Sequence, residues 1–194
     1  MITRSLVLLV CVLLTGALWA EEIMSADAAY SISPEPREAK LESMLVAGYE
    51  VHDSMDHDQI MNCWMNLMQN YASIKSATGD VLYGITYFTE NYDPETFTGY
   101  AYMAATEVKS EENLPKDMVL RKIAAANYLV FEHRGPLSRL EDSFNYIFQK
   151  YLPNSKREFL QSDVLESYDK RYNAENPEDP ESVIEIWMPV KAIE

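Results

Sequence analysis

Cysteine is scarce in this chain, which has two of them among 194 residues. Cys11 lies in an apolar segment at the N-terminus, so Cys63 stands alone if that segment is removed, and no intrachain disulfide is then available. The fold must rest on its hydrophobic core instead. Because Cys63 sits in an apolar helical pattern, we expect a buried, inert thiol rather than a nucleophile.

Basic residues are also few. The chain has 16 lysines and arginines against 31 aspartates and glutamates, and its formal net charge is -15. A negative field of this size repels phosphate backbones, so we expect no nucleic-acid partner. The same field attracts cationic small molecules.

No apolar run reaches the ~20 residues that a membrane-spanning helix needs. The apolar segment at 6–20 is short, follows the basic Arg4 and ends on the small residue Ala20. This pattern predicts a signal peptide at 1–20, export to a periplasmic or extracellular location, and no stable membrane insertion after cleavage. An uncleaved N-terminal membrane anchor is the alternative.

The rest of the chain is long enough for one domain with a sizeable core. Residues 21–39 contain Pro34 and Pro36 without apolar periodicity, which predicts a flexible lead-in. The domain is therefore expected at 40–194. Its oligomeric state cannot be predicted from these patterns.

Motifs for cofactors and nucleophilic catalysis are missing as well. The sequence contains no Gly-rich phosphate loop and no Gly-x-Ser-x-Gly motif. His52 and His57 stand five residues apart among aspartates in a predicted turn, without an evident third neutral ligand. We therefore expect no cofactor and no metal, and a solvated polar turn at 52–58.

Two amphipathic helices and six strands can be placed by periodicity. Ile60, Trp64 and Leu67 recur at helical spacing in 59–74, and Leu140 and Phe144 do so in 140–151. The strands are expected at 41–51, 81–88 and 100–108 in the first half and at 118–131, 164–168 and 181–190 in the second.

This order predicts an α+β fold in which a strand–helix–strand–strand unit occurs twice, at 40–108 and 118–192. Neither unit can bury its faces alone, so antiparallel sheets and two main helices should pack around a pseudo-two-fold axis. A cleft at the junction of the halves is the expected ligand site.

The last strand carries an acid between apolar neighbours. Side chains alternate across a strand, so Glu185 should share one face with Val183 and Trp187. If that face is covered, an ionised Glu185 needs a cation, hydrogen-bond donors or water. A solvent-facing edge strand and a structural ion pair with a lysine or arginine are equally open interpretations.

Several stretches together resemble the GyrI-like effector-binding family, the ligand-binding domain of AraC-type and MerR-type transcription activators. The resemblance covers about 40–192 and is carried by 126–135 (ANYLVFEHRG), 151–155 (YLPNS), 165–169 (LESYD) and 183–190 (VIEIWMPV), with looser matches at 47–49, 82–85 and 100–102. The chain has Ala126 or Asn127 where the family often has glycine before the tyrosine-containing strand. The predicted signal peptide occupies the place of a DNA-binding segment, so we do not expect transcription control in cis.

The resemblance implies a central aromatic pocket with an acid in the last strand, which here matches Glu185 beside Trp187. Tyr83, Tyr102 and Phe131 are then the first choices for the pocket walls, and Tyr100 and Tyr87 are the alternatives. The implied ligands are small, cationic or aromatic organic compounds.

Three functions remain in competition. The favoured one is an exported small-molecule binding protein, because nothing in the sequence requires chemistry; no catalytic residue is assigned. The second is a hydrolase of reactive small molecules, as the resemblance suggests for some relatives, with Glu185 as base and Tyr83 or Tyr102 as hydrogen-bond donor. The third is a protein-interaction module, resembling stand-alone members that inhibit DNA gyrase.

Overall fold

The computed structural model describes most of the chain, namely residues 30–54, 56–93, 95–96 and 98–192. The predicted signal peptide and residues 21–29 lie outside this part. Residues 30–39, assigned by the sequence to a flexible lead-in, contain β1 and most of β2.

The strands are β1 (Ser31–Ile32), β2 (Arg37–Leu41), β3 (Met44–His52), β4 (Ala77–Asp93), β5 (Thr98–Val108), β6 (Val119–Ile123), β7 (Ala126–Arg134), β8 (Val164–Tyr168) and β9 (Val183–Val190). The helical elements are α2 (His57–Asn70), the 3-10 turns η2 (Tyr71–Ser73) and η3 (Leu137–Arg139), α3 (Leu140–Tyr146), the π-helical turn η4 (Ile147–Tyr151) and α4 (Leu152–Asn154).

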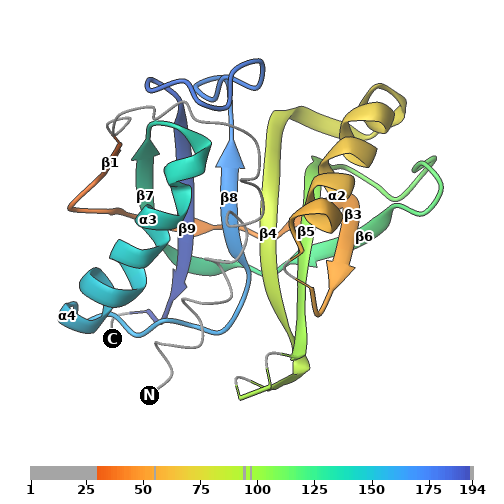
Figure 1. Cartoon of the computed structure of the whole chain (residues 1–194). Coiled ribbons are helices and arrows are strands. Elements are labelled where there is room, and N and C mark those ends of the chain that lie inside the picture. The colour runs from red at the N-terminus through yellow and green to blue at the C-terminus, as the bar shows by residue number, and fades with distance from the viewer. Residues whose placement is uncertain (1–29, 55, 94, 97, 193–194) are drawn as a thin grey trace.

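All nine described strands belong to one antiparallel sheet, in the order β1-β7-β9-β8-β4-β5-β3-β6, with β2 also paired to β7. The helices α2 and α3 both lie on one face of this sheet, each over its own half (Figure 1). The predicted α+β class is confirmed.

The sheet is built from two copies of one unit. The first half runs β3–α2–β4–β5 and the second runs β7–α3–β8–β9, and in each half the last strand lies between the other two. The halves meet where β4 pairs with β8, which we call the β4–β8 seam. This arrangement is the strand–helix–strand–strand duplication expected from the helix stripes, with one difference: the strand predicted at 118–131 is divided into β6 and β7.

A second junction joins the halves, away from the β4–β8 seam, through the outermost strands of the sheet. β2 and β3 pair with β7 and β6 in one unbroken register, from Arg37 opposite Val130 to Gly48 opposite Val119. Two residues separate β2 from β3, and two separate β6 from β7. Each of these two segments of the chain therefore passes from one outer edge of the sheet to the other within roughly 11 Å. The sheet must therefore curl until its two outer edges meet. We call the two paired segments, 37–48 and 119–130, the edge ribbon.

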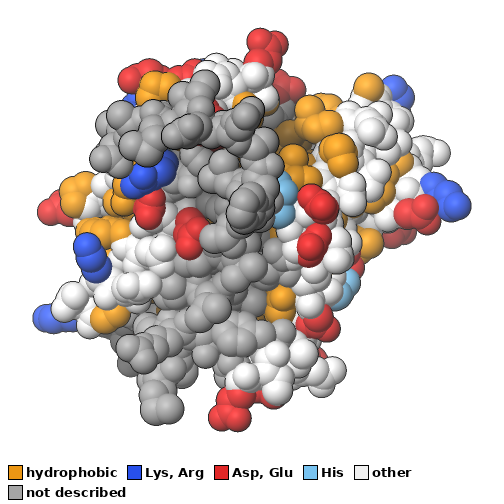
Figure 2. Space-filling model, in the orientation of Figure 1, with side chains coloured by type: hydrophobic (Ala, Val, Ile, Leu, Met, Phe, Trp, Pro, Cys, Tyr) orange, Lys and Arg blue, Asp and Glu red, His pale blue; other side chains and the backbone are white. Residues whose placement is uncertain are grey.

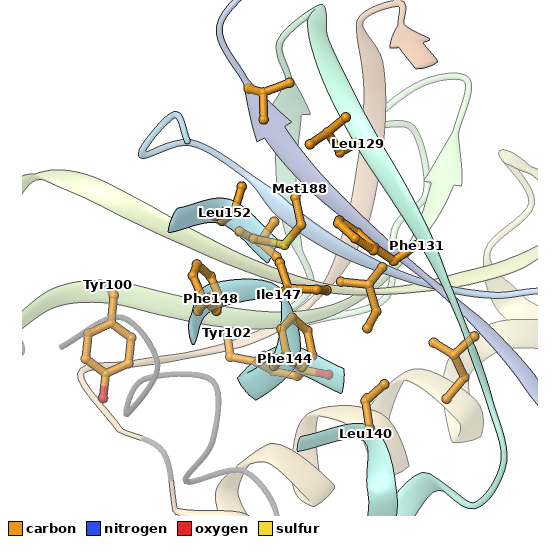
Figure 3. Packing of buried hydrophobic residues seen from close by; sticks show 14 of the residues in the cluster. Tyr100, Tyr102, Leu129, Phe131, Leu140, Phe144, Ile147, Phe148, Leu152 and Met188 are labelled. Carbon is orange, nitrogen blue, oxygen red and sulfur yellow. The ribbon is translucent and has the colours of Figure 1, made fainter. Parts of the chain in front are cut away.

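Apolar side chains fill both faces of the curled sheet. On the helix face, Phe144, Ile147 and Phe148 pack against Phe131 and Met188 of β7 and β9 (Figure 3). A second cluster lies between α2 and β3–β5, and a third lies on the opposite face against the edge ribbon. Because both faces are covered, most residues of the central strands are buried whichever way they point.

Candidate functional site

A cavity lies on the helix face, between α2 and α3, above the β4–β8 seam. Its volume is about 510 Å³. The lining residues are His57, Ile60, Met61, Trp64 and Met68 of α2; Asp80 and Leu82 of β4; Tyr102 of β5; Glu166 and Tyr168 of β8; Leu137, Leu140 and Phe144 of η3 and α3; and Asp169, Lys170, Tyr172, Ala174 and Pro177 of the loop after β8.

Helix α2 forms one wall because its apolar stripe is wider than the sheet can cover. The helix begins after Asp56, whose side chain accepts a hydrogen bond from the Gln59 backbone N–H at 3.1 Å. Ile60, Cys63 and Leu67 are buried against the sheet. The adjacent side of the helix, with Met61, Trp64 and Met68, is left to line the cavity.

The cavity contains a buried carboxylate, that of Glu166, which is only 4% exposed. Burial raises the pKa of Glu166 to about 7, although hydrogen bonds from the Tyr168 and Tyr102 hydroxyls partly oppose the shift. The Tyr168 hydroxyl donates to the carboxylate at 2.8 Å, and the Trp64 indole N–H donates to the Tyr102 oxygen at 3.0 Å. No lysine or arginine of the described ranges forms an ion pair with Glu166.

Glycine is required at the centre of this network. Gly84 of β4 is the register partner of Glu166, and Tyr102 comes from β5 on the other side of β4. A Cβ at Gly84 would lie 2.5 Å from the Tyr102 hydroxyl oxygen and 2.6 Å from Glu166 Oε2. The two side chains therefore meet in the space that the missing side chain leaves.

Aromatic rings surround the acid. The Trp64 and Tyr168 ring centroids are 5.1 Å apart, those of Tyr168 and Tyr172 are 5.0 Å apart, and both pairs are edge-to-face. Burial raises the pKa of the Tyr102 and Tyr168 hydroxyls well above the usual tyrosine value, so both stay neutral donors. The site combines the buried acid Glu166 with π-faces in a largely apolar cavity, whose lining also includes Asp80 and Asp169.

Glu185, the acid chosen from the sequence, does not line this cavity. Its strand alternates as predicted, but Ile184 and Ile186 face the helices, whereas Glu185 and Trp187 lie on the opposite face. There the carboxylate accepts hydrogen bonds from Arg37 at 3.0 Å, Arg171 at 2.9 Å and the Trp187 indole at 3.0 Å. The expectation that Glu185 points into the cleft is corrected: it belongs to an ion-pair cluster.

The other predicted residues are divided between the two faces. Tyr102 lines the cavity. Tyr83 lies on the face of Glu185, Phe131 is buried beneath α3 with its ring 5.0 Å from that of Tyr151, and the alternatives Tyr100 and Tyr87 are buried in opposite core clusters.

In the part of the chain that the structure describes, no hydrogen bond joins the pair considered for hydrolysis. Burial raises the pKa of the Tyr83 hydroxyl, and the charge of Glu185 adds to this shift. Tyr83 and Glu185 each pair with Ser167, from the two sides of β8, so their backbones are roughly 10 Å apart.

The polar turn at 52–58 has structural roles among its described residues. Asp53 accepts hydrogen bonds from the Gly99 and Tyr100 backbone N–H groups, and His52 contacts Glu50 at 2.7 Å. Asp56 caps α2.

Glu166, Tyr168 and Trp64 line the cavity but were not predicted from the sequence as site residues. A usable signal was present: in β8, Val164, Glu166 and Tyr168 share one face, so the strand places an acid between apolar neighbours just as β9 does. Trp64 stands on the predicted helix stripe at a position that can reach this face.

Comparisons with known proteins bear on the fold and the family of this chain. Residues 34–191 match the family described as GyrI-like small molecule binding domain. The transcriptional regulator BrlR of Pseudomonas aeruginosa is 27% identical over 146 residues, which cover 75% of this chain and 51% of BrlR. The chain thus spans about half the length of this curated relative.

Solved structures show the same fold at low identity. SAV2435 bound to tetraphenylphosphonium is 20% identical with a TM-score of 0.59, covering 81% of this chain and 94% of that one. The EcmrR C-terminal domain is 15% identical with a TM-score of 0.61, covering 84% and 99%. An integron cassette protein of Vibrio cholerae is 18% identical with a TM-score of 0.59, covering 84% and 99%.

Proposed function

Because this chain belongs to the GyrI-like small-molecule binding domain family, we propose that it binds an organic cation bearing aromatic groups in the cavity above the β4–β8 seam. The observation that carries the proposal is Glu166, a buried carboxylate that no described lysine or arginine neutralises.

The physical argument rests on what ionised Glu166 requires. Removing a carboxylate from water is costly unless a cation or strong donors compensate. Tyr102 and Tyr168 supply donors, yet the pKa of Glu166 remains raised to about 7, so the compensation is incomplete. A bound cation supplies the missing charge, and the Trp64 and Tyr168 rings add cation–π attraction.

The shape of the cavity supports an organic ligand rather than an inorganic ion. A volume of about 510 Å³ is within the usual range for small-molecule sites. Most of its walls are apolar or aromatic, and they suit a ligand with hydrophobic groups around its charge. The likeness to SAV2435 bound to tetraphenylphosphonium, a cation with four phenyl groups, also favours this ligand class.

Isothermal titration with tetraphenylphosphonium tests the proposal. Glu166→Gln keeps the shape of the side chain and removes its charge. Losing one partner of a desolvated charge pair commonly costs ~2–5 kcal/mol, so we expect the affinity to fall by more than about tenfold. Glu158→Gln is the matched control, because Glu158 pairs with Lys191 outside the cavity.

Two results would contradict the proposal. If the native protein fails to bind the probe, the cavity has another ligand class. Equal affinity of native protein and Glu166→Gln would instead show that the carboxylate plays no part in binding.

We also propose that the protein acts outside the cytoplasm. The support is the sequence at 1–20, in which a basic residue precedes a short apolar run and a small residue at the expected cleavage point. In the part of the chain that the structure describes, no helix is long and apolar enough to cross a membrane. N-terminal sequencing of protein from its native envelope should find Glu21 first; finding Met1 would support the membrane anchor instead.

A further inference from the structure

Helix α2 exposes three methionines. Met61, Met65 and Met68 are 40%, 47% and 55% exposed, and they are the exposed large hydrophobic residues of the described chain. Their spacing of four and three residues places them side by side on one face of the helix. Hydrophobic side chains gather over α2 in the surface view (Figure 2).

Two of these methionines belong to the wall of the ligand cavity. Met61 and Met68 line it together with Trp64, and Met65 is one turn from Met61 on the outer side of the same helix face. A change in the chemistry of these side chains therefore alters the surface that an aromatic ligand touches.

The thioether is the group on this helix that an oxidant can reach. Cys63 is 5% exposed on the sheet side, and burial raises the pKa of its thiol, so its reactive thiolate is scarce. Exposed methionine needs no ionisation: it is oxidised directly to the sulfoxide, which is polar where the thioether is apolar.

We propose that Met61 and Met68 form an oxidation-sensitive wall, with Met65 beside them on the same helix face, and that conversion of these methionines to sulfoxides by peroxide weakens binding of the organic cation. The inference rests on the proposed function. In the reaction the thioether sulfur attacks one peroxide oxygen, an S–O bond forms as the O–O bond breaks, and water leaves after proton transfer. Sulfur is oxidised by two electrons and the peroxide is reduced by two.

Weakened binding follows from the chemistry of the product. Each sulfoxide oxygen keeps water at the wall, and that water must be removed or accommodated when phenyl groups pack there. Met61 and Met68 also lose the apolar contact that a flexible thioether makes with an aromatic ring. We expect the affinity for tetraphenylphosphonium to fall by about tenfold when both are oxidised.

The experiment combines peptide mass spectrometry with titration. Folded protein is treated with hydrogen peroxide until Met61, Met65 and Met68 are sulfoxides, while the fully buried Met103 and Met188 serve as internal markers of an intact fold. Affinity for tetraphenylphosphonium is measured before oxidation, after it, and after repair by methionine sulfoxide reductases. The Met61→Leu/Met65→Leu/Met68→Leu variant keeps an apolar wall of similar volume without an oxidisable sulfur.

A control variant, Met44→Leu/Met118→Leu, removes partly buried methionines that pack in other core clusters. We expect oxidation to weaken binding by the native protein and by this control, reductase treatment to restore it, and the triple leucine variant to be insensitive. Unchanged binding with all three sulfoxides present would overturn the inference and leave a merely apolar wall. An equal loss in the triple leucine variant would overturn it too, whereas failure of the untreated protein to bind would overturn the proposed function itself.

Discussion

Glu166 and Gly84 are register partners across the β4–β8 seam, and the carboxylate of one occupies the space that the other leaves empty. Because the seam joins the two copies of the repeated unit, the acid lies where the halves meet. The second half supplies the acid, Glu166. The first half supplies Gly84, which has no side chain and so leaves room for the carboxylate.

This relationship predicts a selective effect of Gly84→Ala. The added methyl group would clash with the Tyr102 hydroxyl and the Glu166 carboxylate, so both must move and their hydrogen bond is disturbed. We expect a loss of ~1–3 kcal/mol in the free energy of unfolding and about a tenfold weaker affinity for tetraphenylphosphonium. Gly79→Ala is the control, because a Cβ there meets nothing within 4 Å. Similar behaviour of the two variants would count against the described network.

Cation binding should depend on pH through Glu166. The pKa of Glu166 is about 7 in the free protein, and the protonated acid offers a cation no charge. The affinity for tetraphenylphosphonium should therefore be constant well above pH 7 and fall by up to about tenfold per pH unit below it. Titrations in buffers of different ionisation enthalpy should show proton release near neutral pH. The Glu166→Gln variant should lack both effects, and a pH-independent native affinity would refute this assignment.

The free energy of unfolding should also depend on pH through Glu166, but in the opposite direction: it should fall as the pH rises. The pKa of Glu166 is raised on folding from 4.5 to about 7, so the unfolded chain ionises first. Its stabilising contribution is fully present below pH 4.5 and is lost as the pH rises to about 7. Relative to native protein, Glu166→Gln should therefore gain stability across this window, on the order of 3 kcal/mol at most. Denaturant unfolding at several pH values measures the difference; no trend would mean that the folded site does not disfavour ionisation.

The Glu185→Gln change should reduce stability without affecting binding. The carboxylate is held by Arg37 and Arg171, which are themselves partly exposed, so solvent screening moderates the loss to ~1–2 kcal/mol. Affinity for tetraphenylphosphonium, measured per folded molecule, should change less than about twofold, because Glu185 lies on the other face of the sheet. If binding instead falls more than about tenfold in a fully stable protein, Glu185 is a ligand residue after all.

Ligand binding should be visible in the fluorescence of one tryptophan. Trp64 lines the cavity and donates to Tyr102, whereas Trp187 lies against Tyr128 and Arg37 on the opposite face. We expect Trp187→Phe to keep the emission change caused by tetraphenylphosphonium and Trp64→Phe to lose it. Trp64→Phe should also weaken binding several-fold, since the Tyr102 hydroxyl loses its donor, at a cost of ~1 kcal/mol.

Much of the fold could be predicted because it is encoded locally. The stripes in α2 and α3 have helical spacing, and the alternation in β9 correctly separates Glu185 and Trp187 from Ile184 and Ile186. Alternation does not say which face the helices cover. Both faces of β9 are buried, so hydrophobicity gave no preference, and the cleft was assigned to the wrong side.

The remaining errors come from contacts between distant residues. Strand β2, with Arg37, Glu38 and Lys40, has no strand pattern of its own and exists because it pairs with β7. The cavity likewise needs Trp64, Tyr102 and Glu166, which three separate elements bring together. The pairing of β2 leaves no periodic trace in the sequence. The alternation in β8 marks Glu166 and Tyr168, but it does not show that Trp64 and Tyr102 meet them.

The edge ribbon makes the two halves exchange strands. The strand that leads into the first half, β2, pairs with β7 of the second, and the strand that leads into the second half, β6, pairs with β3 of the first. A half on its own would leave its first strand uncovered and its leading strand without a partner, which is the situation that drives domain swapping between identical chains. The duplicated chain thus has the connectivity of a swapped homodimer whose two subunits have been joined, and we expect its halves to fold as one cooperative unit.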